Sequence, residues 1–278
     1  MPRVRQLRGH ARTTVGVLEH VLWIGGPPGS GKTTIASRIA RRYGLRLYSA
    51  DTTTWEHRDR AIREGNPAAI RWEAMTPSER WERPPDELLA MSIHLARGPM
   101  IVDDLRRLPA SPLIVAEGSP ISPALVADRL RALWLLPTRE LQRARLEERK
   151  LAPGPAALYE RAAAEIDRQA REQHMPVLVV DGSCGLDEVV AAVERHFADP
   201  LAAGPRAVNE DERRSLLREA NAAIVSQVRA YHARPWAVAD AGTDVRTLAC
   251  ECGDRSCEAD VRLAVGAFEA GPVLAPGH

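Results

Sequence analysis

The sequence has no long hydrophobic run: no apolar segment among its 278 residues approaches the roughly 18 to 20 residues that a membrane-spanning helix needs. We also expect no secretory signal, because the basic start at residues 1–5 is followed by neither an apolar core nor a small-residue cleavage site. We therefore expect a cytoplasmic protein without a membrane partner. A hydrophobic content of 45% and a charged content of 27% are typical of globular chains in water.

The sequence also lacks an excess of either charge and contains almost no lysine. The formal net charge is +1, so the basic surface on which non-specific nucleic-acid binding depends is not indicated, and we expect no nucleic-acid partner. Of 38 basic residues, only Lys32 and Lys150 are lysines. Because lysine is so rare, a chance match to the motif G-x-x-x-x-G-K-[S/T] is expected on the order of once in a thousand such chains.

This motif is present at residues 26–33, as Gly-Pro-Pro-Gly-Ser-Gly-Lys-Thr. The apolar segment 17–24 before it is rich in β-branched and aromatic residues, and a helical pattern after it runs through Ile35 and Ile39 to a stop at Gly44. Strand, loop and helix in this order are the context in which the motif binds phosphate, in contrast to an ordinary Gly-rich turn.

Further strands and helices alternate along the chain. Four more segments have the pattern of short strands: 45–50, 112–117, 131–136 and 176–180. Helical stretches are predicted around 55–64, 85–107, 138–150, 156–174 and 186–197. This alternation predicts an α/β fold with a five-stranded, parallel, doubly wound sheet whose ligand lies at the carboxyl ends of the strands.

A change in composition after residue 198 predicts a second domain. Residues 199–207 are rich in Pro, Gly and Ala and are typical of a linker. A helix at about 209–232 follows, and then a short segment with three of the four cysteines. We expect a first domain at 1–198, a linker at 199–207 and a small Cys-rich α+β domain at 208–278.

The motif at 26–33 has the groups needed to hold the phosphates of ATP or GTP. Its glycines allow the backbone to turn successive N–H groups inward, and the N-terminus of the next helix adds the positive end of its dipole. Lys32 is expected to reach the β- and γ-phosphates, and the Thr33 hydroxyl to ligate Mg²⁺. The residues predicted to bind the nucleotide here are Gly26, Pro28, Gly29, Ser30, Gly31, Lys32, Thr33 and Thr34.

With this motif and this order of elements, residues 17–198 resemble the P-loop small-molecule kinases. That group includes nucleoside-monophosphate kinases, shikimate and gluconate kinases, and antibiotic phosphotransferases. The Walker A loop is the specific part of the resemblance. It implies ATP-dependent phosphoryl transfer to a small hydroxylated acceptor, with Lys32 stabilising the charge on the transferred group.

The resemblance also implies roles for two carboxylates. In that group a carboxylate at the end of the second strand faces the acceptor hydroxyl, and Asp51 matches it as the catalytic base. Asp51 also precedes Thr-Thr-Thr-Trp, where it would simply cap the next helix. Glu117 closes the third strand, where the family has an acidic residue near Mg²⁺ or the acceptor, although a buried structural carboxylate is the alternative. We assign the pair Asp103 and Asp104 to a solvated helix face.

Two more regions match the family after the fourth and fifth strands. Residues 136–149 resemble its lid, in which Arg145 and Arg149, at i and i+4, would close over the transferring phosphate with Arg143 nearby. The alternative is pairing with neighbouring glutamates on the helix surface. Asp181 begins a loop that resembles the one beside the nucleotide base, although Asp-Gly is also a common turn.

The acceptor is expected between Asp51 and the helical region 55–110. That region contains side chains suited to stacking and hydrogen bonding: Trp55, His57, Arg58, Trp72 and Trp81. They would recognise a sugar, a nucleoside or an antibiotic ring, or else they pack the core of the region. The sequence therefore leaves the acceptor unnamed.

The cysteines of the tail are spaced for metal binding. Cys250, Cys252 and Cys257 have the spacing C-x-C-x4-C, which in a reducing compartment fits thiolate ligation of Zn²⁺ better than disulfides. The segment resembles a small Cys-rich module appended to various actinobacterial proteins, and that resemblance makes His278 the fourth ligand. Three free thiols are the alternative. Cys184 is expected to be a small packed residue.

Two other functions are compatible with the same residues. One is a nucleotide-binding regulatory module that signals through the Cys-rich tail, and the other is a plain NTPase without an acceptor. All three functions share the nucleotide and Mg²⁺, and they differ in whether hydrolysis or transfer depends on a second small molecule.

Overall fold

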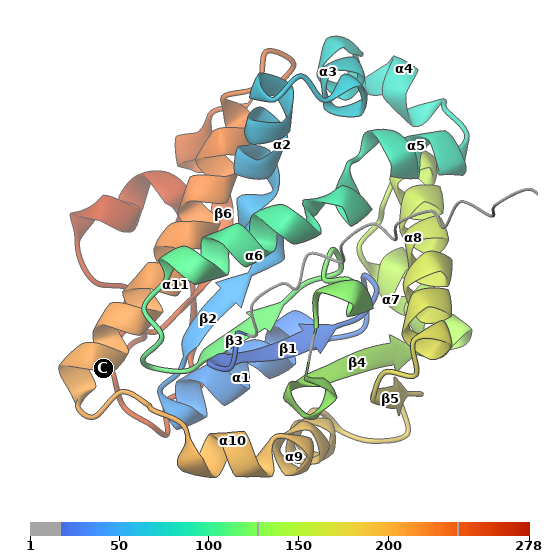
Figure 1. Ribbon diagram of the computed structural model, residues 1–278. Coiled ribbons are helices and arrows are strands. Elements are labelled where there is room, and N and C mark those ends of the chain that lie inside the picture. Colours follow the sequence, from blue (N-terminus) through green and yellow to red (C-terminus); the bar gives the residue numbers. More distant parts are fainter. Residues whose placement is uncertain (1–17, 127, 238) are drawn as a thin grey trace, which may run out of the picture.

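The structure is a computed structural model that describes residues 18–126, 128–237 and 239–278 (Figure 1). The basic start and Val17, the first residue of the first predicted strand, lie outside these ranges. Five parallel strands form one sheet in the order β2-β3-β1-β4-β5. Their bounds are Val21–Gly25 for β1, Arg46–Ser49 for β2, Ile114–Glu117 for β3, Ala132–Pro137 for β4 and Val177–Val180 for β5. The five strands predicted from the sequence are confirmed, with ends shifted by a few residues.

Helices cover both faces of this sheet, as a doubly wound fold requires (Figure 1). The side chains of β1 alternate: Val21 and Trp23 belong to the core on one face, and Leu22 and Ile24 to the core on the other. The first face is covered by α6 (Gly98–Arg107) and α8 (Pro153–Glu172), and the second by α1 (Lys32–Tyr43), α9 (Leu186–His196) and α10 (Ala198–Ala203). The chain therefore has an α/β fold of the P-loop type.

The segment between β2 and β3 contains more helices than the sequence predicted. It has the helices α2 (Thr54–Arg63), α3 (Pro67–Ala74), α4 (Pro77–Trp81), α5 (Pro85–Met91) and α6. The missed helices α3 and α4 each begin with a side-chain cap followed by proline, from Asn66 and Thr76. The single helical stretch predicted at 85–107 is interrupted at Ile93, whose φ of 54° lies in the left-handed region.

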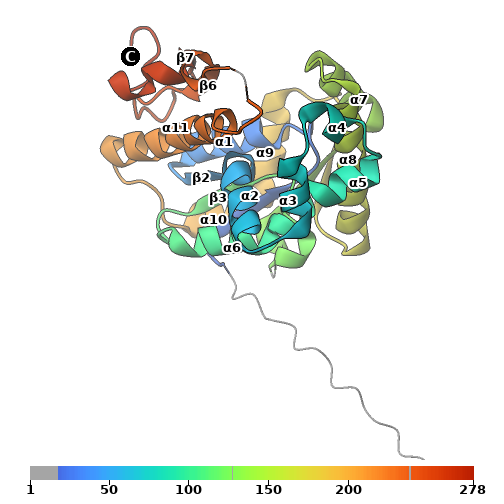
Figure 2. The same ribbon diagram turned by 90° about the horizontal axis from the view of Figure 1, so that it is seen from above.

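The C-terminal part is built on the long helix α11 (Glu210–His232). It carries an antiparallel hairpin of β6 (Val245–Ala249) and β7 (Asp260–Ala264) and a small apolar core of its own. Figure 2 shows α11 between this hairpin and β2. The segment 199–207, predicted as a linker, begins with α10, because Leu201 packs into the core beneath α9.

Several ion pairs tie α11 to the sheet domain. Arg46 pairs with Glu219 of α11 at 3.0 Å, and Arg234, two residues after the end of α11, pairs with Asp59 of α2 at 2.6 Å. The α11 helix therefore runs along β2 and ends beside α2, near the carboxyl edge of the sheet. Among the described helices, none has the combined length and apolarity that crossing a membrane requires.

Candidate nucleotide and acceptor site

The loop between β1 and α1 has a backbone that only glycine adopts readily. Gly26 has a φ of 143°, and a Cβ built there would lie 2.4 Å from the carbonyl oxygen of Leu135. The loop closes on itself through the Ser30 amide, which donates to the Pro27 carbonyl at 3.2 Å. Lys32 is almost buried at 5% exposure, and its Nζ lies 3.4 Å from the same carbonyl. The loop is therefore preformed, with its lysine folded inward.

Helix α7 (Arg139–Glu148) holds this loop from outside. The Gln142 amide donates to the Pro28 carbonyl at 3.0 Å, and the Arg145 guanidinium donates to the Gly29 carbonyl at 2.8 Å. Arg145 is thus at the loop itself, instead of in the surface pairing that the sequence left open. Arg149 and Lys150 follow α7 and are exposed, and Arg149 lines the large cavity described below.

Three oxygen-bearing side chains meet where β1, β2 and β3 end. The Thr33 hydroxyl donates to Glu117 Oε2 at 3.1 Å, and the Ser49 hydroxyl donates to Glu117 Oε1. The strand register explains the meeting, because Glu117 is paired with Ile24 of β1 and Ser49 of β2. Ser49 was not singled out from the sequence. Its position at the end of a predicted strand was the feature of the sequence that could have indicated a role at this site.

Glu117 is wholly buried, and burial raises the pKa of its carboxyl, although nearby Lys32 and the two hydroxyl donors oppose that shift. A buried carboxylate beside hydroxyl oxygens needs a cation, and oxygen ligands of this kind suit Mg²⁺. Thr33 and Glu117 therefore fit the predicted role in holding Mg²⁺, and Ser49 adds a third oxygen.

Asp51 lies in the 3-10 turn η1 (Ala50–Thr53), directly after β2. It is exposed and lines the same cavity as Lys32 and Thr33. In the described chain, α2 begins after Thr53 without any side-chain capping hydrogen bond. The capping role that the sequence left open for Asp51 is therefore absent, and Asp51 lines the cavity together with Lys32 and Thr33.

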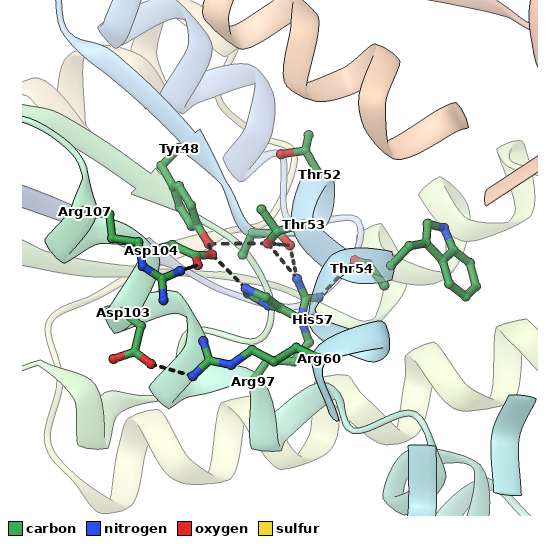
Figure 3. Close-up of polar contacts among 12 residues, drawn as sticks. Tyr48, Thr52, Thr53, Thr54, His57, Arg60, Arg97, Asp103, Asp104 and Arg107 are labelled. Carbon is green, nitrogen blue, oxygen red and sulfur yellow. Dashed lines mark hydrogen bonds and ion pairs between the residues drawn. The ribbon is translucent and has the colours of Figure 1, made fainter. Parts of the chain in front are cut away.

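A buried polar network fixes η1 from below (Figure 3). The Arg97 guanidinium donates to the Ala50 carbonyl and to the Thr53 and Thr54 hydroxyls, the latter two at 3.1 and 3.0 Å. Its Nε also donates to His57 Nδ1 at 3.1 Å. Arg97 is 2% exposed, so each of these bonds forms away from water.

The network ends on Asp104 of α6. His57 Nε2 and the Tyr48 hydroxyl both donate to Asp104 Oδ2 at 2.7 Å (Figure 3). Burial raises the pKa of the Asp104 carboxyl, but these two hydrogen bonds outweigh it, so the net shift is downward. Our assignment of Asp104 to a solvated helix face was wrong, because α6 presents it to β2 and α2. His57 is held in this network, at 1% exposure.

A cavity of about 630 Å³ opens next to the phosphate loop. Its walls include Lys32, Thr33 and Asp51, together with four of the side chains expected to meet the acceptor: Trp55, Arg58, Trp72 and Trp81. The α11 end of the C-terminal part adds another wall, made of Gln227, Tyr231, His232 and Trp236. No local pattern in the sequence links these residues to the loop, so their place was missed.

Asp181 lies at the end of β5 in an Asx turn. Its carboxylate accepts from the backbone amide and the hydroxyl of Ser183, at 2.9 and 2.6 Å, and these bonds lower the pKa of its carboxyl. The geometry is that of the Asp-Gly turn that the sequence left open. A contact with the nucleotide base stays a prediction. Cys184 is exposed, so its expected packing was wrong, because the loop lies outside the core.

The Cys-rich tail brings its four predicted ligands together. The sulfur atoms of Cys250, Cys252 and Cys257 and a ring nitrogen of His278 all lie within 4.8 Å of one another. Cys250 is buried, and its sulfur lies 3.7 Å from His278 Nδ1 and accepts from the Ala275 amide at 3.3 Å. Three thiols and an imidazole at this spacing form a cluster that fits a tetrahedral metal ion.

Comparisons with known proteins give one relative in sequence. No protein-family model matches the chain. A tRNA dimethylallyltransferase of Acidothermus cellulolyticus is 30% identical over 160 residues, which make up 57% of this chain and 48% of the relative. The chain thus spans about half the length of the curated relative that it matches.

Two solved structures are similar at a lower level. An unliganded sugar kinase of a Janibacter species is 20% identical, with 66% of this chain and 97% of that chain covered and a TM-score of 0.38. An uncharacterized protein from Eubacterium ventriosum is 12% identical, with 64% and 98% covered and a TM-score of 0.32. TM-scores this low carry no conclusion about function.

Proposed function

We propose that the chain transfers a phosphoryl group from ATP or GTP to a small hydroxylated acceptor held in the 630 Å³ cavity. The observation that carries the proposal is the convergence of Lys32, Thr33 and Asp51 on that one cavity, beside the buried Glu117. A phosphate loop that opens into a second compartment, walled by other segments, suits a donor on one side and an acceptor on the other.

Each residue has a defined part in this reaction. Lys32 neutralises charge on the transferred group, and Thr33 and Glu117 would hold the Mg²⁺ that screens the phosphates. Asp51 orients the acceptor hydroxyl and takes up its proton. Phosphoryl transfer passes through a loose transition state, so positioning contributes more than deprotonation. Arg145 and Arg149 close the site from α7, and Asp181 flanks the base.

Acceptor-dependent release of ADP tests the proposal. The full chain is incubated with ATP, Mg²⁺ and a panel of nucleosides, sugars, aminoglycosides and their phosphorylated or carboxylated counterparts. Release only in the presence of an acceptor supports phosphoryl transfer. Release without any acceptor indicates a plain NTPase, and nucleotide binding without turnover indicates a regulatory module. Either of these last two results contradicts the proposal.

A second candidate function is group transfer to tRNA, which the name of the curated relative indicates. A dimethylallyl donor with a diphosphate leaving group would place that diphosphate on the same glycine loop. The net charge of +1 argues against an extended tRNA surface. Mass spectrometry of tRNA incubated with the chain and dimethylallyl diphosphate separates the two functions, because only the second leaves a modified nucleoside.

For the tail, we propose that residues 208–278 are a distinct unit held together by one Zn²⁺ at Cys250, Cys252, Cys257 and His278. The close spacing of these four residues and the small apolar core of the unit support this proposal. A unit of about 70 residues is rarely stable without a metal ion, a disulfide or a similar cross-link. Thiolate ligation also requires reduced cysteines, which suits the cytoplasm. Elemental analysis of protein purified without added metal tests the site.

A further inference from the structure

The cavity wall beyond Asp51 contains an unusual number of buried nitrogen atoms without a hydrogen-bond partner. Among the described residues, they are Nε and Nη1 of Arg58, Nε of Arg80, the indole nitrogens of Trp72 and Trp236, and Nε2 of His94. All five residues line the cavity. Because buried polar groups are normally paired, donors left free around one cavity indicate a bound molecule that accepts from them.

The two arginines are held by aromatic rings. The Arg58 guanidinium carbon lies 4.7 Å from the ring centroid of Trp72, and that of Arg80 lies 4.6 Å from the same ring. Arg80 also lies 4.9 Å from the ring of Trp236, which follows α11. Each guanidinium also donates through Nη2 to backbone carbonyls, Arg58 to Ser92 and Arg80 to the carbonyls of residues 72 and 75. Stacking uses none of the remaining N–H groups, so Nε and Nη1 of Arg58 and Nε of Arg80 stay available to a ligand.

Burial makes these positive charges costly. Arg58 is 3% exposed and Arg80 is 2% exposed, and burial lowers the pKa of the Arg58 guanidinium to about 9. Nearby Glu73 offsets part of the charge, and it approaches Arg234 at 3.7 Å, but neither of its oxygens has a hydrogen bond among the described residues. A bound anion would compensate the positive charges that burial has removed from water.

The charged side chains of the cavity are mostly positive. Apart from Lys32 on the nucleotide side, they are Arg58, Arg80, Arg97, Arg149 and the single carboxylate Asp51. The guanidinium N–H groups of Arg97 donate to η1 and to His57. Arg58 and Arg80 are therefore the two buried arginines of the cavity that have N–H groups without a partner among the described residues.

We propose that the acceptor carries an anionic group of its own, a phosphate or a carboxylate, and that Arg58 and Arg80 bind it. This rests on the proposed function insofar as the cavity is taken to hold the acceptor. The C-terminal part is then required for acceptor binding, because Trp236 and Tyr231 close the wall against which Arg80 and Trp55 are stacked. Asp51, which lines the same cavity, receives the hydroxyl.

Matched pairs of neutral and anionic compounds test this in the full-length wild-type protein. Suitable pairs are a nucleoside with its monophosphate, a sugar with its phosphate, and a cyclic polyol with its carboxylate. Binding is followed by calorimetry and by the fluorescence of the cavity tryptophans, and turnover by ADP release. We expect the anionic member of a productive pair to bind at least about tenfold more tightly, the range for hydrogen bonds to a charged group.

Variants of one helix locate the effect. Arg58→Gln should weaken binding of the anionic compound at least about tenfold and leave the nucleotide Kd unchanged, and Arg58→Lys should recover part of the affinity. Arg63→Gln is the matched control, because Arg63 lies on the same helix and is exposed to solvent. Its binding and turnover should equal those of the wild type.

The outcomes separate this inference from the proposed function. If neutral compounds bind and are phosphorylated as efficiently as their anionic partners, the inference is overturned and phosphoryl transfer stands. If anionic compounds bind in an Arg58-dependent way but none stimulates ADP release, the anion site stands and phosphoryl transfer fails. If Arg58→Gln does not fold, the affinities of the wild-type protein for the neutral and the anionic member of each pair still test the inference. Equal affinities overturn it.

Discussion

The two ends of the cavity are built in different ways. The nucleotide end comes from eight consecutive residues, 26–33, whose backbone conformation is set by glycines and whose lysine is preformed in place. The acceptor end is assembled from side chains of separate segments: α2, α3, α4, the turn around Arg97 and the end of α11. The phosphate loop is formed by one short segment, so we expect its shape to tolerate substitutions elsewhere in the fold. The acceptor wall is formed by stacked side chains, so its shape depends on every segment that contributes one of them.

The largest effect is expected at the nucleotide end, where one substitution should remove activity without lowering stability. Lys32→Ala should abolish turnover, because the phosphate charge loses its main counter-charge, while the melting temperature stays close to that of the wild type. Activity and thermal unfolding are measured together. Lys150→Ala, the only other lysine variant available, is the control and should be fully active. Normal nucleotide affinity and turnover in Lys32→Ala would refute the phosphate-loop assignment.

The next effect lies between the two ends. Asp51→Asn should lower kcat by at least about a hundredfold, the lower range for loss of a general base, with the nucleotide Kd little changed. Because no cap depends on its carboxylate, stability should also be retained. A sharp fall in melting temperature with normal activity per folded molecule would assign Asp51 a structural role instead.

At the acceptor end, the metal cluster should act at a distance. Cys252→Ser should abolish stoichiometric zinc and raise the acceptor KM several-fold, because α11 and Trp236 would lose their support, while nucleotide affinity is unchanged. Cys184→Ser is the control, since Cys184 is exposed and lies in the loop after β5. Zinc should also be released on acidification, as protons compete for the thiolates. Metal-free wild-type protein with three freely reacting thiols would contradict the site.

The smallest effect on turnover and a clear effect on stability are expected at the network beneath η1. Asp104→Asn should cost about 1 to 3 kcal/mol at neutral pH, the range for hydrogen bonds to a charged group. The pKa of Asp104 is lower in the folded state than its ordinary value of 3.8. Its stabilisation is therefore complete above that value and is lost as the pH falls through the folded-state pKa.

Urea unfolding of the wild type and Asp104→Asn at pH 7 and at a pH well below 3.8 measures this difference, which should shrink in acid. Asp103→Asn is the neighbouring control: its carboxylate pairs with Arg60 near the surface, and an exposed ion pair contributes about 0 to 1 kcal/mol. Equal costs for the two variants, or a gap that persists in acid, would count against the buried network.

The same contrast explains what could be predicted from the sequence. The five strands and the glycine loop follow from short apolar runs and from one local motif, so they were found. The convergence of Thr33 with Glu117 was also accessible, because the loop that leads to Thr33 follows β1 and Glu117 closes the neighbouring parallel strand β3. The interruption at Ile93 was not, since it precedes Arg97, whose partners His57 and Ala50 lie 40 and 47 positions earlier in the chain.

The C-terminal wall was missed for a related reason. The apolar residues of α11 predict a helix but not which surface it covers, and its docking involves ion pairs with distant segments, such as Glu219 with Arg46. Trp72 was recognised as a candidate and Trp236 was not, and their stacking on Arg58 and Arg80 brings together four separate segments. Cys250, Cys252, Cys257 and His278 lie close together in space. The cysteine spacing was visible in the sequence, whereas His278 was predicted only from the resemblance to a Cys-rich module.

The scarcity of lysine gives this chain an unusual chemical handle. Lys32 is 5% exposed, whereas Lys150 is exposed where α7 gives way to α8. A protease specific for lysine should therefore nick the native chain only after Lys150, and an amine-reactive dye should attach to that side chain in preference to Lys32. Since Arg149 next to it lines the cavity, such a dye would report ligand binding from the rim of the site without any engineered residue.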